Sequence, residues 1–143
     1  MSARDVFVDT GAFHALLVSN DPLHPSAVKC LQAIQNSRRG LVTTDYVLDE
    51  SATLLKARGV GAQIPRLFDL VERSRALTIE WVAEDRFALA RDFMIRHHDH
   101  SYSFTDCASF VVMRELEIRD ALTADRHYRE AGFRPLLAGH QSL

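Results

Sequence analysis

Residues 104–133 read FTDCASFVVMRELEIRDALTADRHYREAGF, and this stretch decides the fold class. The apolar spacing of Phe104–Leu116 predicts a helix. Asp120–Thr123 predicts a short strand, and Arg126–Ala131 predicts a short helix that ends at Gly132. Helices and strands that alternate in this way are typical of an α/β protein built on a parallel sheet.

The same alternation extends outward to both ends of the chain. Further strands are expected at Asp5–Val8, Leu41–Thr43, Leu77–Val82 and Arg134–Leu137, and further helices at Ala12–Val18, Pro25–Ser37, Asp45–Arg58, Ala62–Ser74 and Ala83–His98. The sequence therefore predicts a parallel sheet with helices on both faces. In such sheets ligands bind beyond the carboxyl ends of the strands.

Composition places the chain among ordinary globular proteins. Its 143 residues are 47% hydrophobic and 25% charged, which predicts one domain spanning residues 1–143. No apolar run approaches the ~20 residues of a membrane span. The first residues lack the features of a signal peptide, so we expect a cytoplasmic protein. Cys30 and Cys107 form no CxxC pair and are expected to be reduced thiols.

Four acids stand at positions that predict a site. Asp9 follows the strand Asp5–Val8 directly, and Asp125 lies two residues after the strand Asp120–Thr123. Glu50 and Asp106 fall on the expected apolar faces of their helices. A carboxylate on a buried face is unfavourable unless it is paired or bound to a metal, and no partner lysine or arginine is evident.

Such a set of carboxylates suits a hard divalent ion. Mg²⁺ and Mn²⁺ prefer oxygen ligands, and a bound ion activates water for attack on a phosphodiester. The net charge of −2 disfavours a nucleic-acid partner, but neutralising four carboxylates would leave +2.

Each acid also has a purely structural interpretation. Asp125 fits the N-cap of the following helix, and Asp106 fits a capping box with Ser103. Asp9 fits a turn beside Gly11. Glu50 would face solvent if its helix were rotated from the expected orientation.

With these residues in view, the chain resembles the PIN domain, the fold of PilT N-terminus-like nucleases, and within it the VapC-type toxins. The resemblance rests on VFVDTGAFHALL at 6–17, DYVLDESATLL at 45–55, YSFTDCASFVVMRELEI at 102–118 and ALTADRHYREAGF at 121–133. These segments carry Asp9, Glu50, Asp106 and Asp125 in turn.

The resemblance implies a three-layer α/β/α sandwich with about four or five parallel strands. It implies that the four acids are metal ligands and catalytic residues, that the cofactor is Mg²⁺ or Mn²⁺, and that the activity is endonucleolytic cleavage of RNA. A homodimer and a protein antitoxin that blocks the site are further implications. Thr10 and Thr105, and more weakly Thr123, are assigned to hydrogen bonds that hold the acids.

Other features are weighed against plain structural roles. His97-His98-Asp99-His100 is expected to be a solvated helix end, with phosphate contact as the alternative. Trp81 is expected in the core. The chain has neither a G-x-S-x-G serine elbow nor a P-loop lysine, and a phospho-aspartate site at Asp9 is disfavoured because Gly11 stands where a second acid is needed. A PIN-like module that binds RNA or protein without cutting is the competing functional hypothesis.

Overall fold

A five-stranded parallel sheet forms the centre of the structure, a computed structural model that describes residues 4–137. The strands are β1 (Val6–Val8), β2 (Leu41–Thr44), β3 (Leu77–Glu80), β4 (Asp120–Leu122) and β5 (Arg134–Pro135). Their order is β3-β2-β1-β4-β5, and every neighbouring pair is parallel. The α/β prediction is confirmed, although β3 and β5 end two residues earlier than expected.

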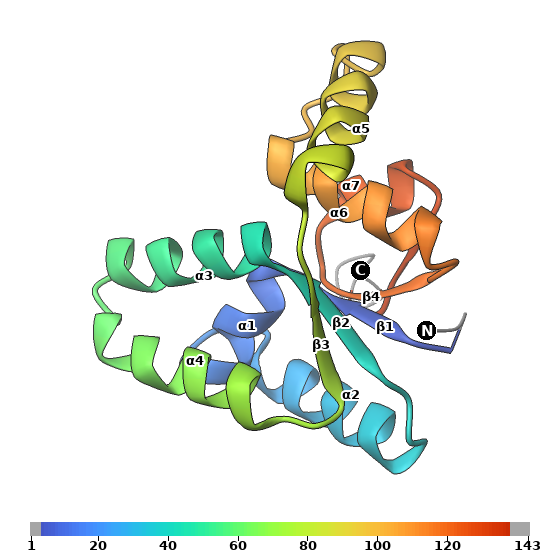
Figure 1. Cartoon of the computed structure of the whole chain (residues 1–143). Helices are drawn as coiled ribbons and strands as arrows, with labels where there is room; N and C mark the ends of the chain where they lie inside the picture. Colours follow the sequence, from blue (N-terminus) through green and yellow to red (C-terminus); the bar gives the residue numbers. More distant parts are fainter. Residues whose placement is uncertain (1–3, 138–143) are drawn as a thin grey trace.

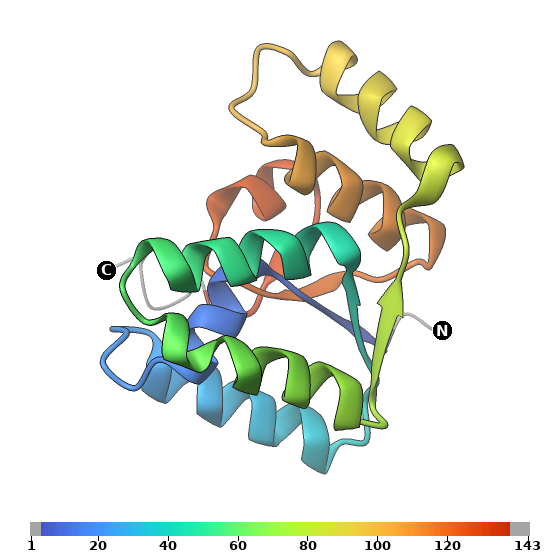
Figure 2. The ribbon, with the colours of Figure 1, turned by 60° about the vertical axis from the view of Figure 1, so that its left-hand side comes forward.

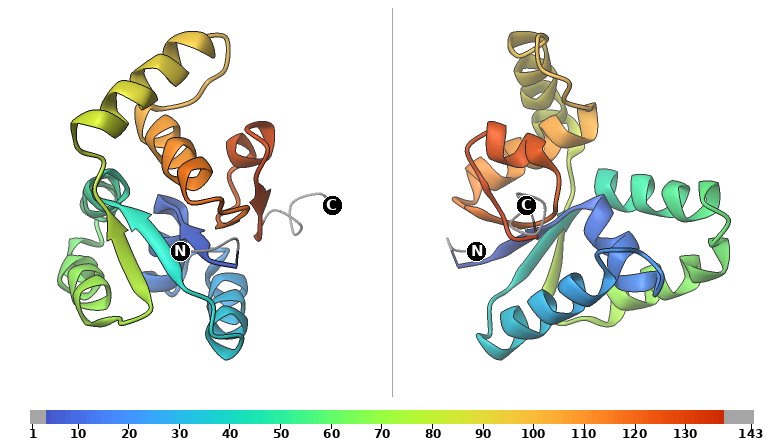
Figure 3. Two further views of the ribbon diagram at one scale, coloured as in Figure 1. Left: turned by 45° about the vertical axis from the view of Figure 1, so that its right-hand side comes forward. Right: turned by 180° about the vertical axis from the view of Figure 1, so that it is seen from behind.

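Within residues 4–137, seven α-helices connect the strands and cover both faces of the sheet (Figure 1). They are α1 (Thr10–Leu17), α2 (His24–Asn36), α3 (Asp45–Ala57), α4 (Ile64–Arg73), α5 (Ala83–Arg96), α6 (Phe104–Glu115) and α7 (Arg126–Glu130), with a 3₁₀ turn η1 (Gly61–Gln63) before α4. Helices α1–α4 lie on one side and α5–α7 on the other (Figures 1 and 3). Right-handed crossovers require this division, because the chain moves outward from β1 to β3 and then returns to β4 on the other side.

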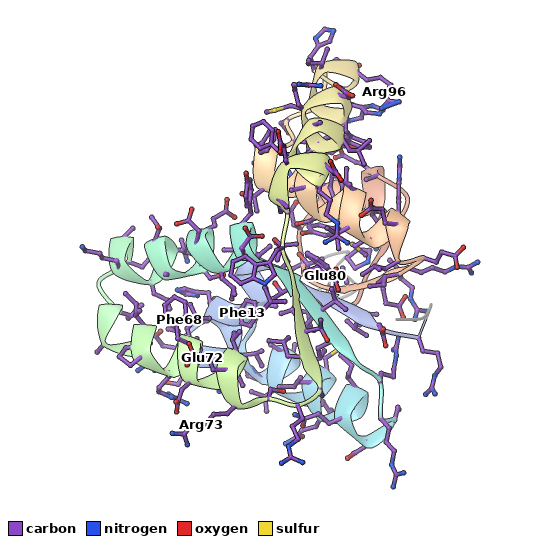
Figure 4. All side chains as sticks on the ribbon, in the orientation of Figure 1. Phe13, Phe68, Glu72, Arg73, Glu80 and Arg96 are labelled. Carbon is purple, nitrogen blue, oxygen red and sulfur yellow. The ribbon has the colours of Figure 1, made fainter. Side chains whose placement is uncertain are left out.

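The helices pair within each layer. Figure 2 shows α3 and α4 as a hairpin beside α1 and α2, while α5 projects from the sheet and packs along α6. Phe13 is buried among the helices of the first layer, whereas Arg96 lies at the outer end of α5 (Figure 4). None of the helices within residues 4–137 is both long and apolar enough to cross a membrane.

Burial explains the strand sequences. All three residues of β1 are at most 2% exposed, as a central parallel strand covered on both faces requires. Phe110 on α6 is fully buried, and its ring contacts those of Phe93, Tyr102, Tyr128 and Phe133. The ring of Tyr128 in turn lies 6.4 Å, centroid to centroid, from that of Phe7 on β1, so this aromatic core joins α5–α7 to the sheet.

Two expectations about single residues had different outcomes. Cys30 and Cys107 are free thiols, as predicted. The expectation that Trp81 lies in the core was wrong, because β3 ends at Glu80 and Trp81, in the connection to α5, is 64% exposed.

The aromatic core predicts unequal costs for two phenylalanine substitutions. Phe110→Ala should lower the free energy of unfolding by about 3–5 kcal/mol, because it opens a cavity in the aromatic core. Phe87→Ala, on α5 and 46% exposed, should cost about 1 kcal/mol or less. Urea unfolding measures both, and equal losses would contradict this account of the core.

Candidate active site

The sheet topology brings the acids together. Strand order reverses between β1 and β4, which are paired in parallel, and the carboxyl ends of such a pair border the crevice where α/β proteins bind ligands. Asp9 directly follows β1, and Asp125 follows β4. The two strand-end acids predicted from the sequence therefore flank the place between β1 and β4 where the strand order reverses, which is called the switch point.

Asp9 is the most buried acid of the group. Its side chain accepts a hydrogen bond from Thr123 Oγ1 at 2.8 Å, and the residue is 7% exposed. Burial raises the pKa of Asp9 to about 6; the hydrogen bond from Thr123, the backbone N–H of Thr10 and the nearby hydroxyl of Tyr128 oppose the rise, and the charge of Asp106 adds to it. The ionised form of Asp9 is therefore energetically unfavourable unless a positive charge lies next to it.

Glu50 reaches the same crevice from α3. Its Oε1 accepts a hydrogen bond from Thr10 Oγ1 at 2.9 Å. The expectation that Glu50 lies on the buried face of its helix was wrong: the residue is exposed, and α3 instead buries Val47, Leu48, Ser51 and Leu55. Glu50 stands at the rim, and the link to Thr10 ties it to the residue next to Asp9.

Asp106 and Asp125 are helix caps as well as pocket residues. Asp106 forms a capping box with Ser103, each side chain accepting from the other's backbone N–H at 3.0 Å. Asp125 Oδ1 accepts from the backbone N–H of His127 at 2.9 Å, and its own N–H donates to Thr123 Oγ1 at 3.0 Å. The capping interpretations are correct and do not compete with a site, because a carboxylate has further lone pairs to offer.

Electrostatic crowding also affects Asp106. Burial is the main cause that raises its pKa, and the charge of Asp125 adds to it, while His127 and the contacts with Ser103 lower it. Within residues 4–137 no lysine or arginine forms an ion pair with Asp9, Glu50, Asp106 or Asp125.

One pocket of about 250 Å³ contains all four predicted acids. It is lined by Asp9, Thr10, Gly11, Leu23, Glu50, Asp106, Thr123, Ala124, Asp125 and Leu137. Thr10 and Thr123 are hydrogen-bonded to acids, as the resemblance implies. Thr105 lies outside this lining, and within the described residues its hydroxyl makes no hydrogen bond to an acid.

His127 is a candidate that sequence reasoning passed over. It belongs to the quoted motif ALTADRHYREAGF, but only the folded chain places its Nδ1 3.0 Å from Asp125 Oδ1 and 3.6 Å from Asp106 Oδ2. Tyr128, next to it, is fully buried, and its hydroxyl lies against Asp9. Burial and the charge of Asp9 raise the pKa of Tyr128 well above its usual value, so the phenol stays neutral.

The histidine-rich segment 97–100 lies beside this group and outside the pocket lining. His100 stacks on Tyr102, with ring centroids 4.7 Å apart, and its Nδ1 lies 3.4 Å from Glu130. Asp99 is exposed and does not line the pocket. None of these side chains joins the four acids.

The donor set fits a divalent cation. Single ligand atoms of Asp106, Asp125 and His127 all lie within 4.8 Å of one another, and Asp9 and Glu50 line the same pocket. Carboxylate oxygens suit Mg²⁺ and Mn²⁺, and a cation would offset the burial, and to a smaller extent the repulsion, that raise the pKa values of Asp9 and Asp106.

Comparison with known families agrees with this geometry. The model of the PIN domain family matches residues 6–134, which include all four acids. The chain belongs to the PIN-domain family.

Two relatives show which group of PIN-domain proteins the chain resembles in sequence. The chain is 34% identical over 128 residues to the 23S rRNA-specific endonuclease VapC20 of Mycobacterium tuberculosis, covering 90% of this chain and 95% of that protein. It is 28% identical over 114 residues to a VapC ribonuclease of Archaeoglobus fulgidus, covering 78% and 72% of the two chains. Within the PIN-domain family the chain is therefore of the VapC type.

A solved structure supports the same placement. The crystal structure of M. tuberculosis VapC20, described as a toxin that cleaves the sarcin–ricin loop, matches with a TM-score of 0.79 at 30% identity. The match covers 90% of this chain and 96% of that one. The VapC-type α/β/α fold implied by the resemblance is thereby confirmed.

The raised pKa of Asp9 predicts a pH-dependent effect of Asp9→Asn on the metal-free protein. A carboxyl group whose pKa rises on folding costs most above about pH 6, costs progressively less as the pH falls, and costs nothing only well below pH 4, where both states are protonated. Asp9→Asn should therefore raise the free energy of unfolding by up to about 3 kcal/mol at pH 8, and by only a small fraction of that at pH 4.

Denaturant titrations in EDTA at the two pH values measure this effect. Asp99→Asn, which neutralises an exposed carboxylate outside the pocket, is the matched control and should change little at either pH. If Asp9→Asn stabilised the protein equally at pH 4 and pH 8, the buried negative charge of Asp9 would not be the source of the destabilisation.

Proposed function

We propose that the protein is a metal-dependent endoribonuclease and the toxin of a type II toxin–antitoxin pair. The observation that carries this proposal is the pocket at the β1/β4 switch point, where four carboxylates meet without a lysine or arginine partner among the described residues. The VapC-type relatives named as RNA endonucleases support it.

Asp9, Glu50, Asp106 and Asp125 would hold one or two Mg²⁺ or Mn²⁺ ions. The bound metal would supply an activated water and neutralise charge on the phosphate. The chain's own contribution is to fix the carboxylates. Thr123 holds Asp9, Thr10 holds Glu50, and the helix caps hold Asp106 and Asp125.

The substrate class is RNA. A structured loop of large-subunit ribosomal RNA is the first substrate to test, because the VapC20 relative is named for 23S rRNA and its structure is described as that of a sarcin–ricin loop cleaving toxin. We further propose that residues 1–143 act as a single domain, as a homodimer in the cytoplasm, and that a protein antitoxin blocks the site.

Cleavage should require both the metal and the acids. Purified protein with Mn²⁺ or Mg²⁺ should cut a labelled sarcin–ricin-type loop or a member of a mixed RNA pool, and EDTA should abolish cutting. Asp106→Asn should lower the rate by at least about 10³-fold with the fold retained, because the lost carboxylate holds the ion.

Asp99→Asn is the control, since it removes an exposed carboxylate outside the pocket and should cut at the rate of the unchanged protein. Gel analysis of the fragments measures the rates. Undiminished cutting by Asp106→Asn, or cutting that persists in EDTA, would overturn the mechanism.

Metal binding should also stabilise the folded protein against unfolding. An ion that binds only the folded state raises the free energy of unfolding, by about 2.7 kcal/mol at one hundred times its dissociation constant. Mn²⁺ should therefore raise the melting temperature of the unchanged protein and of Asp99→Asn, and raise that of Asp106→Asn much less. If the melting temperature does not change with metal and no RNA is cut, the alternative of a non-cutting PIN-like binding module gains support.

A further inference from the structure

His127 presents a nitrogen atom to two of the acids from the first turn of α7. Its Nδ1 lies 3.0 Å from Asp125 Oδ1 and 3.6 Å from Asp106 Oδ2. The opposite side of the ring is held in place, because Nε2 lies 2.8 Å from Ser101 Oγ and the edge of the ring meets Tyr102 at 87°. The imidazole is thus oriented by contacts from the loop between α5 and α6.

Among residues 4–137 the Nδ1 atom finds no hydrogen-bond partner, despite its carboxylate neighbours. It is shielded from solvent, and its distance to Asp125 Oδ1 is short, but the alignment that a ring N–H needs is lacking. The nearby oxygens already accept backbone hydrogens: Asp125 Oδ1 from His127 and Asp106 Oδ2 from Ser103. A buried polar atom in this position calls for another partner.

The spacing of the three side chains suits a shared cation. One ligand atom from each of Asp106, Asp125 and His127 can be chosen so that all lie within 4.8 Å of one another. Ligands about 2.1 Å from one ion lie about 3–4.2 Å apart, so small side-chain adjustments suffice. The contact between Nε2 and Ser101 matches the arrangement of metal-bound histidines, whose second nitrogen commonly donates to an oxygen.

We propose that His127 is a nitrogen ligand of the ion that Asp106 and Asp125 hold, and that Ser101 is its positioning residue. The proposal rests on the metal site of the proposed function and adds a consequence for metal choice. Mg²⁺ takes oxygen ligands almost exclusively, whereas Mn²⁺, the first ion in the order of rising affinity for nitrogen ligands among the transition metals, accepts an imidazole beside carboxylates more readily than Mg²⁺ does. The site therefore favours Mn²⁺ over Mg²⁺ more than four carboxylates alone would.

The side chains of the other histidines near the site contact residues other than the four acids. His100 stacks on Tyr102 and lies beside Glu130, and His97 packs against Phe93. His98 is exposed on the same segment, which makes it a suitable control for the loss of an imidazole away from the acids.

Pulsed electron paramagnetic resonance of the Mn²⁺-loaded protein tests the ligand directly. Full-length protein grown with ¹⁵N-histidine should show a histidine nitrogen coupled to Mn²⁺, and His127→Ala should lose the coupling while His98→Ala keeps it. Absence of the coupling in the unchanged protein, or its persistence in His127→Ala, overturns the proposal. The spectrum of the unchanged protein can overturn the proposal even if a variant folds poorly, because it must show a histidine nitrogen coupled to Mn²⁺.

Calorimetric titration supplies the second readout. His127→Ala should weaken Mn²⁺ binding about tenfold or more and Mg²⁺ binding much less, and His98→Ala should change neither. An equal loss for both ions would contradict a nitrogen ligand.

RNA cleavage assayed in parallel separates the two proposals. Nitrogen coupling without any RNA cleavage keeps the ligand and overturns the nuclease. Metal-dependent cleavage without nitrogen coupling keeps the nuclease and overturns the assignment of His127 as a ligand. If the unchanged protein binds no Mn²⁺, both the ligand assignment and the metal site of the proposed function fail.

Discussion

The parallel pairing of β1 with β4 is the constraint on which the site depends. Val6, Phe7 and Val8 pair with Asp120, Ala121 and Leu122, so the two strands end level with each other although they are far apart in the sequence. Level ends place Thr123 within 2.8 Å of the carboxylate of Asp9. A shift of one residue in this register would also turn the side chains of β4 to the opposite face. The buried strands therefore fix the geometry of the acids.

Helix capping performs a second task at this edge. Asp106 lies in the first turn of α6 and Asp125 is the N-cap of α7, and their hydrogen bonds from backbone N–H groups restrict the rotation of each carboxylate. The free energy of a cap, about 1 kcal/mol, partly offsets the repulsion between acids held close together. The structural and functional interpretations of these residues are therefore two aspects of one arrangement.

The sequence predicted the fold well because its signals are local. The strand–helix alternation and the caps at Ser103 and Asp125 depend only on near neighbours. The orientation of α3 was not predictable in this way, because the face it buries is set by packing, and Glu50 lies beside that face rather than on it. The position of His127 depends on Ser101, twenty-six residues away, and no pattern within the motif encodes that contact.

In the metal-free chain the buried carboxylate of Asp9 destabilises the fold, and binding of a cation would offset this unfavourable free energy. Asp9 lies in a position where its ionised form is disfavoured, as its pKa of about 6 indicates, and a fully buried, neutral Tyr128 lies behind it. Folding alone would favour a neutral residue at position 9. A carboxylate kept there against its own desolvation makes sense where a divalent ion compensates the charge, and the unpartnered nitrogen of His127 is explained by the same ion. The proposed ion would thus give one physical explanation for two features that are unfavourable for stability.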